Sequence, residues 1–125
     1  MEYKLRILVL DDEEIVVARL KPALEKEGYI VDTFTNSKLA KNHLEKNKYD
    51  IVVTDLKMAD IDGLQLFRFV KEKWPGTKVV LISGFATLKV AQDALKEGVY
   101  QVIPKPFKIS HIKELINNIE IESKI

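Results

Sequence analysis

The sequence contains no cysteine, which excludes disulfides, thiolate metal sites and cysteine nucleophiles. It also lacks an excess of charge of either sign, because 20 basic and 19 acidic residues leave a net charge of +1. That balance gives no electrostatic reason to expect nucleic acid or an anionic membrane as the main partner. The apolar run at residues 5–10 is too short for a signal peptide or a membrane span. We therefore expect a cytoplasmic protein that makes no membrane contact.

The chain of 125 residues has the length of one domain, and its 46% hydrophobic content suits a globular protein with a core. Short apolar segments predict five strands, at residues 5–10, 29–34, 50–54, 78–82 and 100–103. Each is followed by a segment with helical spacing of apolar residues. This alternation predicts an α/β fold, a doubly wound five-stranded parallel sheet with helices on both faces.

The apolar residues at helical spacing are candidates for the buried helix faces. The first helix follows the acidic residues 11–14 and stops at Gly28, and Asn36 or Ser37 caps the second. The next helices are predicted at 64–73, at 87–97 and from about Ile109. Their candidate core residues are Ile15, Val16, Ala18, Leu20 and Leu24; Leu39, Ala40 and Leu44; Leu64, Leu66, Phe67 and Val70; Val90, Ala91, Ala94 and Leu95; and Ile112, Leu115, Ile116 and Ile119.

Polar side chains follow four of the five predicted strands. In open parallel sheets, ligands bind outside the carboxyl ends of the strands. The residues at those ends are Asp11 and Asp12, Asp55, Ser83 and Lys105. We therefore expect these five side chains to meet at one edge of the sheet, although separate segments supply them.

Three carboxylates brought together in this way repel one another, by roughly 4 kcal/mol for each pair about 4 Å apart at an effective dielectric constant near 20. A divalent cation removes that repulsion, and oxygen ligands without histidine or cysteine favour Mg²⁺ first and Mn²⁺ second. With the Lys105 ammonium and the Ser83 hydroxyl beside it, Asp55 would be the nucleophile of a phosphoryl-transfer site.

Each of these residues alone also has a purely structural interpretation. Asp11 and Asp12 would cap a helix, and Asp55 would cap a turn. Ser83 would satisfy a backbone group, and Lys105 would lie in a surface loop. The functional interpretation therefore depends on their meeting in space, which the predicted topology favours.

Four motifs in this order resemble the receiver domain of two-component response regulators. They are LVLDDE (Leu8–Glu13), VVTDLKMADIDG (Val52–Gly63), LISG (Leu81–Gly84) and KPF (Lys105–Phe107). The resemblance covers about residues 4–121 and implies a flavodoxin-like strand order 2-1-3-4-5. It implies a receiver domain over residues 1–125 with no output domain.

The resemblance also implies roles for the residues at the sheet edge. Asp55 matches the phosphoacceptor. Asp12 matches a direct Mg²⁺ ligand, Asp11 matches one acting through water, and the backbone carbonyl of Lys57 matches the main-chain ligand. The resemblance implies a phosphoacceptor and not an enzyme, with at most self-phosphorylation from small phosphodonors and autodephosphorylation.

Four further positions concern the switch that follows phosphorylation. Ser83 matches the hydroxyl residue that bonds the phosphoryl group and shifts on activation. Lys105 matches the lysine that pairs with the aspartate or its phosphate, and its bond to Pro106 is expected to be cis. The family usually has an aromatic switch residue where this chain has Val102. Tyr100 is the nearest aromatic residue and, on a strand, would share a face with Val102, so it is a second candidate for the switch residue.

The resemblance implies a sensor histidine kinase or phosphotransfer protein as phosphodonor, and an unknown output domain or target protein as recipient of the signal. Residues 84–87 (GFAT) and 98–107 (GVYQVIPKPF) are similar to receivers of nitrogen-regulator-type activators. The chain is accordingly expected to be a single-domain regulator or the receiver of a longer protein. Homodimerisation is expected through the fourth helix, fifth strand and fifth helix, with no direct nucleic-acid binding.

Three alternatives belong to other functional classes. A pseudo-receiver would act as an interaction module without phosphorylation, which the absence of an aromatic residue at Val102 favours. A phosphatase of the haloacid dehalogenase type needs Asp-x-Asp after the first strand and a cap insertion, whereas here Asp11 and Asp12 are adjacent. A flavodoxin-like flavin binder would place phosphate where these two acids repel it.

Overall fold

The computed structural model describes residues 3–85 and 87–123. The chain ends of the predicted 1–125 domain, and Ala86 of the GFAT segment, lie outside these residues. Strands and helices alternate throughout: β1 (Arg6–Leu10), α1 (Glu14–Glu25), β2 (Ile30–Phe34), α2 (Ser37–Leu44), β3 (Ile51–Asp55), α3 (Gly63–Lys73), β4 (Lys78–Ser83), α4 (Leu88–Glu97), β5 (Gln101–Pro104) and α5 (Ile109–Ser123).

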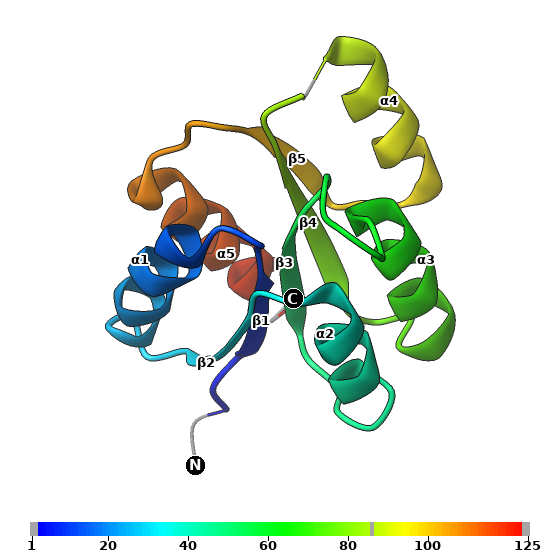
Figure 1. Ribbon diagram of the computed structural model, residues 1–125. Coiled ribbons are helices and arrows are strands. Elements are labelled where there is room, and N and C mark those ends of the chain that lie inside the picture. The colour runs from blue at the N-terminus through cyan, green and yellow to red at the C-terminus, as the bar shows by residue number, and fades with distance from the viewer. Residues whose placement is uncertain (1–2, 86, 124–125) are drawn as a thin grey trace.

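The strands form a five-stranded parallel sheet in the order β2-β1-β3-β4-β5, which confirms the predicted fold. Figure 1 shows α1 and α5 on one face of the sheet and α2, α3 and α4 on the other. Alternate strand residues enter two separate cores, because successive side chains point to opposite faces. In β4, for example, Val80 and Ile82 join the α1/α5 core, and Val79 and Leu81 join the α2/α3/α4 core.

The helix starts follow from local capping. Asn36, and not Ser37, caps α2, since its side chain accepts a hydrogen bond of 3.0 Å from the Leu39 N–H. Asp62 and Gln65 form a reciprocal capping box at the start of α3. Thr87 caps α4, which stops at Gly98 with φ 116°, a conformation that glycine adopts without strain.

Several predicted core positions are wrong. Ile15 and Ala18 are exposed, and Val17 is buried in their place because α1 is rotated relative to the predicted stripe. Leu39 and Leu95 are also exposed, at 60% and 44%. The buried positions of α1 are Val17, Leu20 and Leu24, which keep helical spacing along one face.

Each of the five strands differs from the prediction by one residue at one or both ends. The predicted third strand stops before Asp55, but this residue is the last of β3. The last strand begins at Gln101, so Tyr100 precedes it. Within the described residues, no helix has the length and apolarity needed to cross a membrane.

Candidate functional site

The strand register determines which side chains meet at the carboxyl edge of the sheet. Leu10 lies opposite Thr54, so the next residues of the two segments, Asp11 and Asp55, become neighbours. On the other side of β3, Asp55 pairs with Ile82. Ser83 then pairs with Pro104, directly before Lys105. The predicted residues therefore reach one edge because parallel strands end together.

Three carboxylates form a cluster at this edge. One oxygen each of Asp11, Asp12 and Asp55 lies within 4.8 Å of the other two. Asp11 is 0% exposed and Asp55 is 6% exposed, while Asp12 faces solvent. Water therefore screens the charges of the two buried carboxylates poorly, and a cation bound beside them would offset their mutual repulsion.

Asp11 has one oxygen in a backbone hydrogen bond and one whose only charged partner among the described residues is Lys105. Its Oδ1 accepts a hydrogen bond of 2.9 Å from the Glu13 N–H. Its Oδ2 is buried and, within the described part of the chain, accepts no hydrogen bond of good geometry, although the Lys105 Nζ lies 2.9 Å away as an ion pair. A buried carboxylate oxygen with unused acceptor capacity, in an all-oxygen cluster, fits a hard divalent cation.

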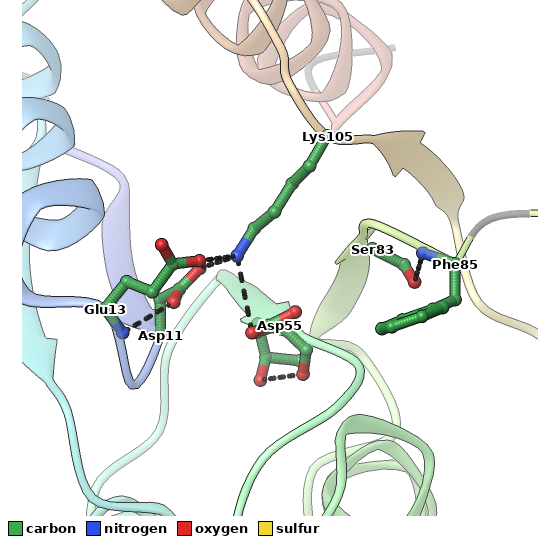
Figure 2. Close-up of polar contacts among 7 residues, drawn as sticks. Asp11, Glu13, Asp55, Ser83, Phe85 and Lys105 are labelled. Carbon is green, nitrogen blue, oxygen red and sulfur yellow. Dashed lines mark hydrogen bonds and ion pairs between the residues drawn. The ribbon is translucent and has the colours of Figure 1, made fainter.

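Lys105 extends from the end of β5 into this cluster (Figure 2). Its Nζ lies 2.9 Å from Asp11 Oδ2, 2.8 Å from Glu13 Oε1 and 3.4 Å from Asp55 Oδ2. The lysine therefore contacts the aspartate expected to react, but lies closer to the two other acids. The peptide bond between Lys105 and Pro106 is cis, as predicted.

These surroundings shift the pKa values of both partners. Burial raises the pKa of Asp55 above its ordinary value, and the negative charge of Asp11 adds to this, while Lys105 opposes it. Burial acts to lower the pKa of Lys105, but its bonds to Glu13 and Asp11 outweigh that and the pKa is raised. Lys105 therefore stays protonated and supplies a fixed positive charge.

Ser83 lies at the edge but is joined to another residue. It is 1% exposed, and its Oγ accepts a hydrogen bond of 2.9 Å from the Phe85 N–H (Figure 2). Between the described side chains, no hydrogen bond joins Ser83 to Asp55. The serine is therefore near the cluster but held toward the start of the β4–α4 loop.

The loop after β3 is held from both ends. Ser37 at the start of α2 donates a hydrogen bond of 2.8 Å to the Ala59 carbonyl and accepts one of 3.1 Å from the Ile61 N–H. The Gly63 N–H donates to the Leu56 carbonyl at 2.9 Å. Lys57 lies in this loop with an exposed side chain, two residues after Asp55.

Val102 and Tyr100 do not share a face, so that expectation is wrong. Val102 is 9% exposed and packs in the α2/α3/α4 core. Tyr100 packs against the α1/α5 core instead, and its hydroxyl donates to both carboxylate oxygens of Glu122 in α5, at 2.9 Å each. Strand alternation does not extend to Tyr100, because it precedes β5.

Sequence reasoning missed the roles of Glu13 and Gly63. Glu13 lies in the LVLDDE motif, but only the contact with Lys105 distinguishes it from an ordinary helix-start acid. Gly63 ends the VVTDLKMADIDG motif, where glycine indicates only a turn. A Cβ atom at Gly63 would lie 2.5 Å from the Asp55 carbonyl oxygen, which the sequence alone does not reveal.

The sequence is similar to a known protein family and to several named proteins. Residues 7–117 match the family described as the response regulator receiver domain. The response regulator receiver protein CpdR of Brucella abortus (strain 2308) is 35% identical over 115 residues, covering 92% of this chain and 93% of that protein. The DNA-binding transcriptional regulator NtrC of Proteus hauseri is 29% identical over 110 residues, covering 88% of this chain but 23% of that protein.

Solved structures show the same likeness. The solution structure of the beryllofluoride-activated NtrC4 receiver domain dimer is 33% identical, with a TM-score of 0.87, covering 94% of this chain and 97% of that one. The crystal structure of a response regulator receiver domain protein from Clostridium thermocellum is 32% identical, with a TM-score of 0.85, covering 96% and 97% of the two chains.

Proposed function

This chain belongs to the response regulator receiver domain family, and we propose that Asp55 is the residue that accepts the phosphoryl group. Receiver domains of response regulators are phosphoacceptor signalling domains and not enzymes. The observation that carries the proposal is the position of Asp55, 6% exposed at the end of β3, between Asp11 and Lys105. A buried carboxylate at that place would be costly without a function that needs it.

The donor is a phosphohistidine of a sensor histidine kinase or phosphotransfer protein. An Asp55 carboxylate oxygen attacks phosphorus, so that a P–O bond forms as the donor's P–N bond breaks. The imidazole nitrogen of the donor keeps the bonding electron pair and is protonated from solvent. Lys105 offsets negative charge on the moving phosphoryl group, because its ammonium already lies 3.4 Å from Asp55 Oδ2.

Asp11, Asp12 and Asp55, with the backbone carbonyl of Lys57, would hold Mg²⁺, or Mn²⁺ in its place. The unused acceptor capacity of the buried Asp11 Oδ2 supports this assignment. A bound divalent cation neutralises phosphoryl oxygens and the repulsion among the carboxylates. Exposed Asp12 offers the more accessible direct ligand, and buried Asp11 acts through water.

Phosphorylation would then change the contacts of Ser83 and Lys105. The phosphoryl group adds charge and three acceptor oxygens. Ser83 would turn from its contact with the Phe85 N–H toward these oxygens, and the β4–α4 loop would repack with it. Val102, on the α4 side of the sheet, lies where this movement would be read out, and its small side chain makes that readout differ from an aromatic one.

The signal passes to an output domain or a separate target protein. The chain spans 93% of CpdR but only 23% of NtrC, so relatives include both a receiver of similar length and a much longer regulator. Similarity to NtrC-type regulators also supports homodimerisation in the phosphorylated state, and α4, β5 and α5 form the surface that we propose for it. In this proposal the domain itself makes no nucleic-acid contact, consistent with its net charge of +1.

The test is incubation of the protein with acetyl phosphate and Mg²⁺ followed by intact-mass measurement. The wild type should gain the mass of one phosphoryl group, and Asp55→Asn should gain none. Asp60→Asn is the matched control, because Asp60 is an exposed carboxylate in the loop after β3 with φ 70°, a conformation that asparagine tolerates. An unlabelled wild type would instead support a pseudo-receiver that acts without phosphorylation.

A further inference from the structure

Glu13 holds Lys105 more closely than the acceptor does. The Lys105 Nζ lies 2.8 Å from Glu13 Oε1 and 3.4 Å from Asp55 Oδ2 (Figure 2). The two acids also differ in exposure, since the Glu13 side chain is 59% exposed and that of Asp55 is 8% exposed. The ammonium is therefore shared between a buried partner and one that can turn into water.

We propose that Glu13 is a positioning residue that retains Lys105 in the unphosphorylated state and competes with the phosphoryl group for it. The inference rests on the proposed function, because it concerns how the Asp55 site changes state. It assigns to Glu13 a role that depends on its side chain, beyond its place at the start of α1.

The anchoring of Glu13 supports this role. Its backbone N–H donates to Asp11 Oδ1 at 2.9 Å, which fixes the main chain beside the cluster. Its carboxylate, by contrast, has Lys105 as its only ion-pair partner among the described residues. Because the backbone of Glu13 is held and its side chain is exposed, the Glu13 carboxylate can bind the Lys105 ammonium and release it without a movement of α1.

The charge balance of the site explains why Glu13 becomes the main competitor. Without a cation, one ammonium faces the carboxylates of Asp11, Glu13 and Asp55. A divalent cation held at the cluster of Asp11, Asp12 and Asp55 would compensate the charges of these three acids, which would leave Glu13 as the uncompensated acid beside Lys105. A phosphoryl group on Asp55 must then draw Lys105 away from Glu13 before it gains the ammonium as a partner.

The test is to measure, by calorimetry at saturating Mg²⁺, the dissociation constant of beryllofluoride, which is a phosphoryl mimic. Glu13→Gln keeps the shape of the side chain and removes the competing charge. Beryllofluoride should bind about two- to fivefold more tightly, the range given by a partly exposed ion pair. Glu14→Gln is the matched control, because Glu14 is exposed, is adjacent in sequence and forms no ion pair among the described residues.

A second measurement separates positioning from a simple loss of negative charge. In a Lys105→Met background the effect of Glu13→Gln should disappear, since Glu13 acts through the lysine. The NMR signal of the Lys105 side-chain nitrogen in the resting protein should also shift in Glu13→Gln and not in Glu14→Gln. An unchanged or weaker affinity in Glu13→Gln, or a tightening that persists without Lys105, would overturn the inference.

The wild type distinguishes failure of this inference from failure of the proposed function. If the wild type takes up neither a phosphoryl group from acetyl phosphate nor beryllofluoride, the phosphoacceptor proposal fails and the role of Glu13 fails with it. If the wild type takes up both and Glu13→Gln behaves like Glu14→Gln, only the role of Glu13 is rejected.

Discussion

Gly63 lies where α3 begins, against the backbone of the β3 end that carries Asp55. A Cβ atom there would lie 2.5 Å from the Asp55 carbonyl oxygen and 2.9 Å from the Leu56 Cα, and both are backbone atoms that cannot rotate away. The Gly63 N–H also donates a hydrogen bond of 2.9 Å to the Leu56 carbonyl, which holds Gly63 close to the end of β3. The geometry of the acceptor thus depends on a residue without a side chain.

Gly63→Ala should lower the free energy of unfolding by about 1–3 kcal/mol, the usual effect of forcing extra volume into a packed region. It should also slow labelling of Asp55 by acetyl phosphate, because the acceptor backbone must shift. Urea unfolding and intact-mass time courses measure the two effects. Gly76→Ala is the control, since a Cβ there meets nothing within 4 Å; similar behaviour of the two variants would refute the steric account.

At this scale the sequence identifies the residues of the cluster but not their partners. Asp11, Asp55 and Lys105 could be predicted to meet because each follows a strand, and parallel strands end at one edge. The preference of Lys105 for Glu13 over Asp55 could not be predicted, because it depends on side-chain conformations. The Lys105 Nζ lies 2.8 Å from Glu13 Oε1 and 3.4 Å from Asp55 Oδ2. The bond from the Phe85 N–H to Ser83 likewise depends on the local loop path.

Among the elements, α4 is joined to the neighbouring helix α3 by side-chain hydrogen bonds at its C-terminal end. Ala94 is its buried residue, whereas Leu88 and Leu95 are exposed. Glu97, the last residue, accepts two hydrogen bonds from the Arg68 guanidinium of α3, at 2.7 and 3.1 Å, and its carbonyl accepts one of 2.6 Å from Lys71. The side-chain hydrogen bonds that join α4 to α3 therefore lie at its C-terminal end, away from the β4–α4 loop that follows Ser83.

The pair between Arg68 and Glu97 has a direct titration signature. The hydrogen bond from Arg68 lowers the pKa of the Glu97 carboxyl below its ordinary value. A lowered pKa means that the tie to α3 is present above the ordinary carboxyl pKa and is lost as the pH falls through the lowered value. Acid should therefore break the ion pair between Arg68 and Glu97 as the Glu97 carboxylate is protonated.

Arg68→Gln should move the pKa of Glu97 upward toward its ordinary value, because the charged donor is lost. NMR titration of the Glu97 carboxyl carbon measures this shift. Lys73→Gln is the matched control, since Lys73 is another α3 cation, with its ammonium 5.6 Å from the Trp74 ring. If the Glu97 titration curve is the same in wild type and Arg68→Gln, the pair does not hold α4.

Sequence patterns identified every element but misplaced some faces and ends. Spacing alone does not determine which face of a helix is buried when apolar residues lie on both sides of the predicted stripe. In α1 the spacing predicts a buried Ile15, whereas Val17 is the buried residue. Leu95 fits the spacing of α4, but the helix buries Ala94 and leaves Leu95 44% exposed. Tyr100 and Val102 lie on different faces of the sheet, because β5 begins at Gln101, one residue later than the apolar pattern indicates.

Part of the exposed apolar surface of the molecule lies on α4, which supplies no residue of the acidic cluster. The doubly wound topology follows from the alternation of strands and helices, and the shared carboxyl edge follows from the topology. The alternation does not reveal which outer surface contacts a second molecule. Leu88 and Leu95 are seven residues apart on α4, hence on one helix face, and are 74% and 44% exposed. An apolar stripe of this kind suits contact with a second chain.

Because the solved NtrC4 receiver similar to this chain is a beryllofluoride-activated dimer, we expect beryllofluoride with Mg²⁺ to raise the mass of this protein in solution from that of a monomer to that of a dimer. Leu95→Asp should prevent this association, since dimerisation through α4 would bury an unpaired charge. Leu39→Asp is the matched control, because Leu39 is 60% exposed on α2. Light scattering with and without beryllofluoride measures the mass. A wild type that stays monomeric while binding beryllofluoride would contradict the dimer, and equal loss of association in both variants would contradict the α4 interface.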